Sequence, residues 1–115
     1  MLNYDVIITQ DAENDLESVG DYIAFELCAP ETAVAFIKSI RKELKTSLSR
    51  TPKGYRLVTK EPWHSRGVRR MNVKNYAAYY VVVEDEAAVY VQNIIFQKRN
   101  LPKMLAEEYP HLGEL

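Results

Sequence analysis

The sequence predicts an α+β fold in which a helical hairpin packs on an antiparallel sheet. Its 115 residues are 47% hydrophobic and 27% charged, with four glycines and five prolines, as is typical of one soluble globular domain. Two long segments repeat apolar residues with the period of a helix, and three later segments are rich in β-branched and aromatic residues. We therefore expect the order β, α, α, β, β, β within a single domain over residues 1–115.

The first strand is expected over residues 4–9, because YDVIIT is β-branched and aromatic. Thr9 then has the position of a helix N-cap, ahead of acidic residues that favour a helix N-terminus. The apolar side chains of the following helix recur every three or four residues and are Ala12, Leu16, Val19, Ile23 and Leu27. This stripe is predicted to enter the core.

A second helix is expected to begin at Pro30, because proline is tolerated in the first turn of a helix and breaks the preceding one. Its apolar residues keep the same spacing and are Ala33, Ile37, Ile40, Leu44 and Leu48. The two segments therefore predict an antiparallel helical hairpin. Residues 51–65 contain two prolines and a glycine without a sustained period, and predict a loop with a short extended piece at 55–58.

Three consecutive antiparallel strands are expected after Gly67, over residues 68–73, 76–84 and 88–96. Lys74-Asn75 separates the first pair and Asp85-Glu86 the second, and both dipeptides are typical of turns. Residues 101–109 predict a short terminal helix, which Pro110 would end.

Charge is distributed unevenly along the chain although the formal net charge is −1. Residues 1–37 carry eight acidic side chains and no Lys or Arg. Residues 38–74 carry twelve Lys or Arg against two Glu, a net charge of +10. We expect these cations to share a concave surface that faces a polyanionic or nucleoprotein partner.

Several classes of protein are excluded by the residues that the chain lacks. Cys28 is the single cysteine, so no internal disulfide forms, and we expect it to be buried and unreactive. His64 and His111 lie far apart without a second cysteine, so we expect no metal and no cofactor. The apolar runs are too short to cross a bilayer and residues 1–10 lack a targeting pattern, so a cytoplasmic protein is expected.

Three stretches carry a resemblance to a known group of proteins: DVIITQDAENDLESVGDYIAFELCAPETAVAFIKSI, PWHSRGVRRMNVKNYAAYYVV and VYVQNIIFQKRN. They resemble the RelE/ParE superfamily of toxins from type II toxin-antitoxin modules, in the branch known as plasmid stabilisation proteins. The resemblance extends to about Arg99 and implies the same element order. It also implies growth arrest as the activity and a cognate antitoxin as partner, whose flexible segment folds over the helices and sheet in a hetero-oligomer.

Two activities occur in that superfamily, and the resemblance carries different residue roles for each. RelE-type members cleave mRNA in the ribosome without a metal, whereas ParE-type members inhibit DNA gyrase and lack the catalytic set. For a nuclease, Arg70 and Arg99 would stabilise charge on the scissile phosphate. His64 or Tyr79 would then transfer protons.

Two departures from the nuclease pattern favour the ParE-type activity. Ala77 stands where the nucleases have an arginine, and Phe96 and Gln97 stand where they have a histidine. The long hairpin over residues 9–48 is also more similar to ParE. The target-binding surface would then contain these cations: Arg66, Arg69, Arg70, Lys74, Lys98 and Arg99.

The pair Arg69 and Arg70 limits this surface, because alternation along a strand sends the two side chains to opposite faces. At most one of them joins any single site. Three hypotheses follow: a gyrase inhibitor, which is not an enzyme; a ribosome-dependent mRNA endonuclease; and a non-toxic nucleic-acid-binding module, whose binding to naked DNA or RNA would depend steeply on salt.

Overall fold

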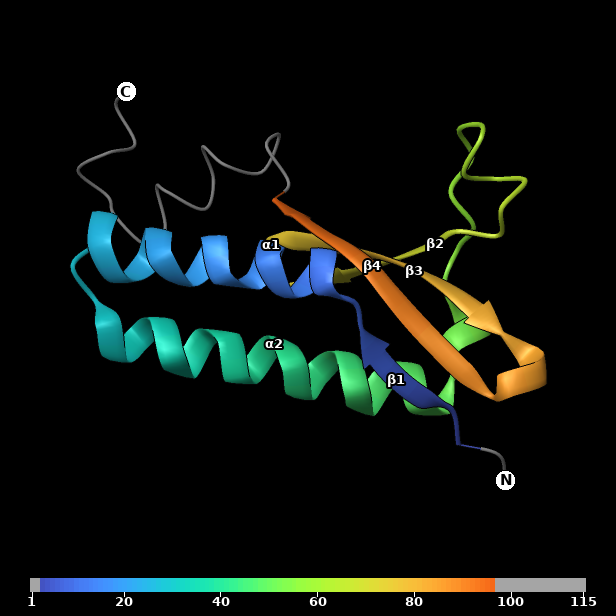
Figure 1. The fold of residues 1–115 in the computed structure, drawn as a ribbon, viewed down its shortest axis with the longest axis horizontal. Helices are drawn as coiled ribbons and strands as arrows, with labels where there is room; N and C mark the ends of the chain where they lie inside the picture. The colour runs from blue at the N-terminus through green and yellow to red at the C-terminus, as the bar shows by residue number, and fades with distance from the viewer. Residues whose placement is uncertain (1–2, 97–115) are drawn as a thin grey trace.

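The computed structural model of the chain describes residues 3–96, arranged as Figure 1 shows. The main elements are β1 (Asp5–Ile8), α1 (Gln10–Asp21), α2 (Pro30–Arg50), β2 (Arg69–Val73), β3 (Tyr76–Val83) and β4 (Ala88–Phe96). A π-helical turn (Tyr22–Glu26) continues α1, and 3₁₀ turns (Pro52–Gly54 and Glu84–Glu86) follow α2 and β3. The predicted α+β fold and its element order are confirmed. The terminal helix predicted at 101–109 lies outside the described residues.

The four strands form one sheet in the order β1-β4-β3-β2. β2, β3 and β4 are antiparallel, as predicted, because short turns connect them. β1 pairs with β4 in parallel, so the sheet is mixed rather than wholly antiparallel. In the sequence, the helical hairpin lies between β1 and the other strands. The direction of β1 is therefore not set by a tight turn, which would impose antiparallel pairing.

The helical hairpin forms as predicted, with its two helices side by side (Figure 1). Thr9 is the N-cap of α1, since its Oγ1 accepts the N–H of Ala12 at 3.4 Å. The Thr9 hydroxyl also donates to the Val91 carbonyl at 2.9 Å and so joins the start of α1 to β4. Cys28 lies between the helices with φ of 53° and is exposed, so the expectation that it is buried is wrong. The left-handed turn that reverses the chain presents its thiol to solvent.

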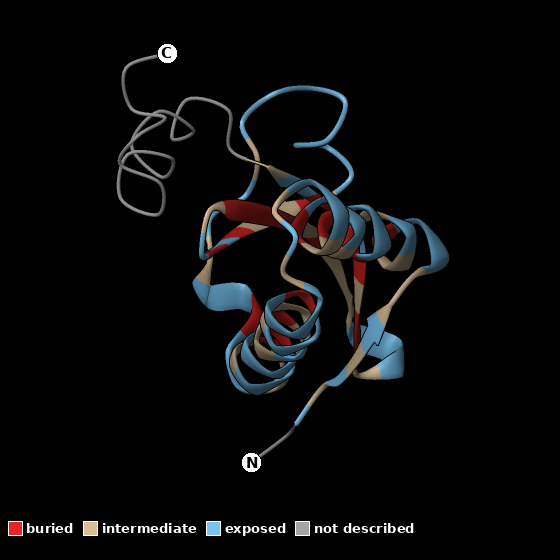
Figure 2. Cartoon of the chain, turned by 90° about the vertical axis from the view of Figure 1, so that its left-hand side faces the viewer, coloured by how far each residue is buried: buried red, intermediate tan, exposed pale blue. Residues whose placement is uncertain are grey.

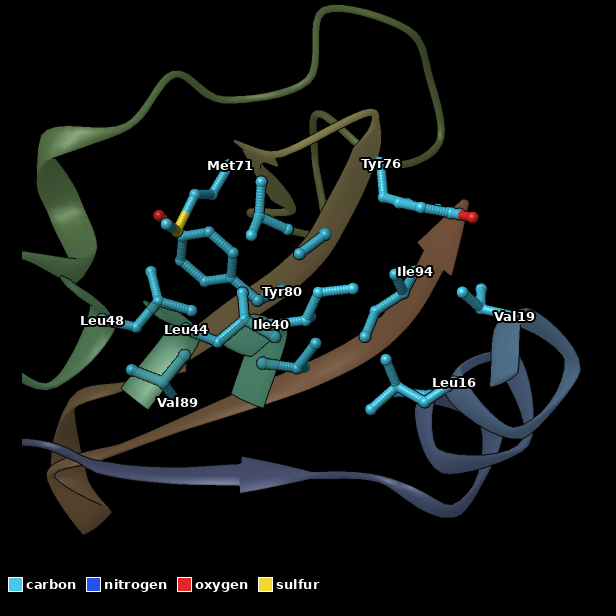
Figure 3. Packing of buried hydrophobic residues seen from close by; sticks show 14 of the residues in the cluster. Leu16, Val19, Ile40, Leu44, Leu48, Met71, Tyr76, Tyr80, Val89 and Ile94 are labelled. Carbon is cyan, nitrogen blue, oxygen red and sulfur yellow. The ribbon is translucent and has the colours of Figure 1, made fainter. Parts of the chain in front are cut away.

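The core lies between the hairpin and one face of the sheet (Figures 2 and 3). Both helical stripes contribute fully buried residues to it, among them Leu16, Ile40, Leu44 and Leu48. Burying each such leucine or isoleucine contributes about 1.5–3 kcal/mol to stability. The predicted core faces of both helices are therefore confirmed.

Two buried tyrosines connect the sheet to the helical layer. Tyr80 is fully buried and its hydroxyl donates to the Pro52 carbonyl at 2.5 Å, which joins the 3₁₀ turn after α2 to β3. Tyr76 packs edge-on against both Phe36 of α2 and Phe96 of β4. Burial raises the pKa of Tyr76 to about 12 and raises that of Tyr80 further above its ordinary value.

The outer edge of β2 is covered by the segment that precedes it. Leu57 forms an isolated antiparallel bridge with Arg69, and the Val58 N–H donates to the Val68 carbonyl at 2.8 Å. The extended piece predicted at 55–58 is therefore present, and it occupies backbone groups that an edge strand leaves open. Within residues 3–96, no helix combines the length and the apolar character that spanning a membrane requires.

Candidate functional site

The sheet has a face turned away from the helices, and this outer face carries the candidate site. Met71, Val73 and Ala78 enter the core. The residues that alternate with them on β2, β3 and β4 therefore point outward and include Arg70, Asn72, Tyr79, Asn93 and Ile95. A register shift between Tyr79 and Tyr80 adds one residue to β4, which leaves Gln92 and Asn93 both exposed.

Arg70 and Tyr79 are the central pair of the outer face. They lie opposite each other in the β2–β3 register, and the Arg70 guanidinium carbon is 6.0 Å from the centroid of the Tyr79 ring. Arg70 Nε also donates to Asn72 Oδ1 at 3.1 Å. A guanidinium supported in this way by a neighbouring ring and an amide is held for anion or carboxylate recognition. The structure therefore brings together two of the residues that the sequence singled out.

Two grooves border Tyr79, one on each side. The first, of about 540 Å³, runs between the 55–59 segment and β2 and includes Arg56, Arg70 and Asn72 in its lining. The second, of about 310 Å³, is more apolar and is lined by Val58, Lys60, Trp63, Val68, Tyr79, Gln92, Asn93 and Ile95. Trp63 is 44% exposed and Ile95 50% exposed, so both offer apolar surface to a partner.

Arg69 belongs to a different part of the structure from Arg70. Its guanidinium donates to the Tyr55 carbonyl at 2.6 Å and to the Lys53 carbonyl at 3.4 Å. These bonds attach the segment after α2 to β2. The prediction that the two arginines face opposite ways is confirmed. Arg69 makes structural contacts with backbone carbonyls, whereas Arg70 borders a groove.

His64 and Arg66 lie in the exposed loop that follows the 55–58 segment. His64 Nδ1 is 2.9 Å from the Val58 carbonyl, which indicates that this nitrogen carries the proton and donates. The Glu61 carboxylate accepts the Ser65 N–H at 2.7 Å and also binds the Ser65 hydroxyl. These bonds lower the pKa of Glu61 below its ordinary value. The loop is thus stabilised internally, and neither groove beside Tyr79 is lined by His64.

The remaining predicted cations do not join this site within the described residues. Lys74 lies in the β2–β3 turn with φ of 54°, and its Nζ is 5.8 Å from the centroid of the Phe36 ring on α2. Lys98 and Arg99 lie outside the described residues. The site that the structure describes therefore contains Arg70, with Arg66 in the adjacent loop.

The basic middle third of the sequence does not form one shared surface, so that expectation is wrong. Arg41 of α2 pairs with Glu13 of α1 at 2.6 Å, and Lys53 pairs with Glu84. Three further cations lie at the grooves: Arg56, Lys60 and Arg70. The basic segment includes a helix, a loop and a strand whose side chains point in different directions. The net charge of a stretch of sequence therefore does not show that its cations share one surface. Among residues 3–96, no three His, Cys, Asp or Glu side chains are grouped as a metal site.

Sequence reasoning missed several residues of the grooves. Gln92 and Asn93 are exposed by the register shift in β4, which alternation alone does not reveal. Ile95 follows a strand pattern that predicts burial on one face but not which face. Ala77, which stands at the position of the nuclease arginine in the resemblance, is fully buried. Its pairing partners are Asn72 on β2 and Ile95 on β4.

Of the comparisons with known proteins, a family model shows the family and solved structures show the fold. A family model described as the ParE toxin of type II toxin-antitoxin system, parDE, matches residues 6–101. No curated protein matches the chain.

Solved structures share the architecture at low sequence identity. The chromosomal ParDE toxin-antitoxin system from P. aeruginosa is 20% identical over 81% of this chain and 95% of that chain, with a TM-score of 0.66. The toxin-antitoxin complex RelBE2 from Mycobacterium tuberculosis is 18% identical over 84% and 93%, with a TM-score of 0.62. The isolated E. coli RelE toxin is 14% identical over 91% and 96%, with a TM-score of 0.55. These similarities establish the fold.

Proposed function

The chain belongs to the ParE toxin family of type II toxin-antitoxin systems, and on that premise we propose that it arrests growth by inhibiting DNA gyrase without cutting RNA. The family match covers residues 6–101 and is the first support for this choice. The second support is the long hairpin, in which a π-helical turn extends α1 toward α2, because the resemblance noted in the sequence associates a long hairpin with ParE-type members.

The observation that carries the proposal is the composition of the outer face around Arg70. Metal-independent RNA cleavage needs a group that removes the proton of a ribose 2′-hydroxyl and a second that protonates the leaving oxygen. Within residues 3–96 the one histidine is His64, and it lines neither groove beside Tyr79. Ala77 adds no cation, because a methyl group stands there, fully buried, at the position where the resemblance places an arginine in the nucleases.

The same face is suited to binding a protein. Arg70, Arg56 and Lys60 give the grooves cationic rims, while Trp63 and Ile95 expose apolar surface between them. Interfaces commonly combine aromatic and arginine side chains in this way. We propose the outer face as the gyrase contact, with Arg66, Lys98 and Arg99 as further contributors and residues 1–115 acting as one domain.

A cognate antitoxin is the proposed partner of the resting protein. The P. aeruginosa and M. tuberculosis structures are toxin-antitoxin systems, and a family member is expected to form the corresponding hetero-oligomer. Because an antitoxin keeps the toxin inactive until it is removed, co-expression of a cognate antitoxin is expected to restore growth.

A second function, ribosome-dependent mRNA cleavage, is favoured by one specific observation. Arg70 and Tyr79 lie side by side and border a groove of about 540 Å³ that Arg56 also lines. Two guanidinium groups and a phenol can bind the phosphate of an RNA and stabilise the charge that develops there. Arg70 and Arg99 would bind the scissile phosphate in that case, and of the two proposed proton-transferring residues, His64 and Tyr79, Tyr79 is the one that borders the groove.

One experiment separates the two functions. Purified gyrase and relaxed plasmid are incubated with the free protein, and supercoiling is followed on agarose gels; RNA ends are mapped in parallel after induced expression in cells. Gyrase inhibition with intact transcripts supports the proposal. Codon-phased cuts with normal supercoiling contradict it and support the nuclease, whereas unchanged growth with salt-sensitive binding to naked DNA supports the binding module.

The matched variants are Arg70→Ala and Lys42→Ala. Both remove one exposed or half-exposed cation, but Lys42 lies on α2 and lines neither groove of the outer face. We expect Arg70→Ala to weaken gyrase inhibition about tenfold or more, as is usual when a charged hydrogen-bonding partner is lost, and Lys42→Ala to leave it unchanged.

A further inference from the structure

The α1–α2 hairpin carries a groove whose two rims have opposite charge. The groove holds about 630 Å³, and α1 contributes the acidic rim with Glu17 and Asp21. α2 contributes the basic rim with Lys38 and Arg41. The floor is apolar and partly built of small residues, namely Leu16, Gly20, Ala24, Ala33 and Ile37. Small floor residues allow a helix to approach closely.

The rims are available for an interaction outside the chain. Glu17, Asp21 and Lys38 are exposed, and in the part of the chain that the structure describes no ion pair neutralises any of the three. Val34 at the same groove is 60% exposed. Figure 2, which looks along the hairpin from the end where the two helices are joined, shows that both helices present exposed residues on the side away from the core.

Two contacts define how the rims are aligned along the hairpin. Glu13 pairs with Arg41 at 2.6 Å, and a Cβ atom at Gly20 would lie 3.6 Å from Ile37 Cγ1. Because the helices are antiparallel, the α1 residues between Glu13 and Gly20 lie opposite the α2 residues between Arg41 and Ile37. Glu17 therefore lies opposite Lys38. Glu13 and Glu17 of α1 thus each have a basic residue of α2, Arg41 and Lys38, across the groove at similar height.

We infer that, in the absence of another partner, the groove binds the same groove of a second copy of this chain. A two-fold axis parallel to the helices would lay α1 of each copy over α2 of the other. Glu17 of one copy would then face Lys38 of its partner, with Asp21 one helical turn further along, and the pair would occur twice, as an isologous interface requires. The alternative two-fold axis, perpendicular to the helices, would lay α1 on α1 and oppose like charges.

The size of the hairpin indicates a weak dimer. α2 has 21 residues and is about 31 Å long, and two helices of about 10 Å diameter with axes about 9 Å apart are together about 19 Å wide, so the hairpin presents a face of about 600 Å². Two such faces bury about 1,200 Å², the lower limit for a specific stable interface. The pairing is therefore expected to have a micromolar dissociation constant and to weaken as salt screens the rims. It does not depend on which target the outer face binds.

Sedimentation velocity of the purified full chain, from about 1 to about 100 µM, tests the inference. The wild type is expected to shift from monomer to dimer over this range. Lys38→Glu alone, and Glu17→Lys with Asp21→Lys, should each remain monomeric about tenfold higher in concentration, because like charges then meet. The variant with all three changes should dimerise again, because each rim has exchanged its sign. Lys42→Glu, an exposed control on α2 outside the groove, should dimerise normally.

Three results would overturn the inference. A wild type that stays monomeric at about 100 µM removes the second copy as occupant. A dimer that Lys38→Glu leaves intact, with unchanged circular dichroism, must use another surface. A monomeric wild type whose antitoxin affinity falls on Lys38→Glu assigns the groove to the antitoxin instead. Gyrase inhibition is measured on the same samples, and its presence or absence tests the proposed function separately.

Discussion

Asp15 of α1 accepts a hydrogen bond from the backbone N–H of Ile94 in β4 at 2.8 Å. β1 pairs with β4 only as far as Ile8 and Val91, so this N–H lies on a part of the β4 edge that no described strand covers. The β3–β4 register shifts just before this point, where Gln92 is the extra residue. The carboxylate of Asp15 therefore satisfies the edge beyond the end of β1 and holds the shifted segment that borders the outer grooves.

Replacing Asp15 with alanine is expected to destabilise the protein. The Ile94 N–H would lose its partner in a half-buried position, which costs about 1–3 kcal/mol of the free energy of unfolding. Asp15→Asn keeps an acceptor oxygen and should cost less. Urea denaturation measures all three proteins, with the exposed Glu43→Ala as control, expected within about 0.5 kcal/mol of wild type. Equal stability of Asp15→Ala and Glu43→Ala would contradict the role of this bond.

Arg69 and Arg70 are neighbours in sequence, but their substitution is expected to change different properties. Loss of Arg69 should lower stability, and loss of Arg70 should weaken target binding. Arg69→Ala removes two bonds to the Lys53 and Tyr55 carbonyls in the segment after α2 and should lower the free energy of unfolding by about 1–3 kcal/mol. Arg70→Ala should leave stability within about 1 kcal/mol and weaken target binding about tenfold or more. Thermal unfolding and gyrase inhibition, measured on both variants, check the contrast. The assignment fails if the two variants show the same pattern.

The loop that contains His64 is expected to loosen at low pH. The pKa of Glu61 is lowered because its carboxylate accepts hydrogen bonds from the Ser65 hydroxyl and N–H. A lowered pKa means that this stabilisation is fully present above the ordinary pKa of 4.5 and is lost as the pH falls through the lower folded value.

The Ser65 amide signal in NMR spectra, followed from neutral pH downward, measures this loss. The chemical shift of the Ser65 N–H should change only once the pH falls below the ordinary pKa of Glu61. Glu61→Gln serves as control, because an amide does not titrate and the Ser65 signal should then be independent of pH over the same range. A Ser65 signal that titrates equally in both proteins would exclude Glu61 as the cause.

Alkaline pH is expected to destabilise the fold through its buried tyrosines. Burial raises the pKa of Tyr76 from 10.0 to about 12, so the folded state holds the neutral phenol. This contribution is fully present below pH 10 and is lost as the pH rises toward the folded pKa of about 12. The loss is about 2–3 kcal/mol for Tyr76, at about 1.4 kcal/mol per pKa unit.

Urea denaturation at neutral pH and above the ordinary tyrosine pKa measures the effect. Tyr76→Phe should keep more of its stability at high pH than the wild type does, because the residue no longer ionises in the unfolded chain. The same alkaline loss in both proteins would mean that another group is responsible.

The fold could be predicted because its local signals agree with one another. Thr9, Pro30 and the two apolar stripes specify the helices through capping, backbone restriction and periodicity, and all of these operate within a few residues. The parallel pairing of β1 with β4 could not be predicted in the same way. It joins Asp5 to Ala88, and no local pattern reports a contact over such a separation.

The candidate site was predictable only in part, for a related reason. Alternation correctly separates Arg69 from Arg70, since it follows from strand geometry alone. The grooves depend on the register shift that exposes Asn93 and on the loop that brings Lys60 to Tyr79, and both are properties of tertiary packing. Charge counted along the chain overstated the basic surface, because Arg41 meets Glu13 across the hairpin.

The exposed position of Cys28 makes the wild-type chain suitable for site-specific labelling. It is the single cysteine of the sequence and lies in the left-handed turn at the end of the hairpin. A maleimide fluorophore would therefore attach at one defined point without any substitution. Since the turn joins α1 to α2, rotational anisotropy of such a dye would report directly on anything that associates with the helical layer, leaving the outer face of the sheet unmodified.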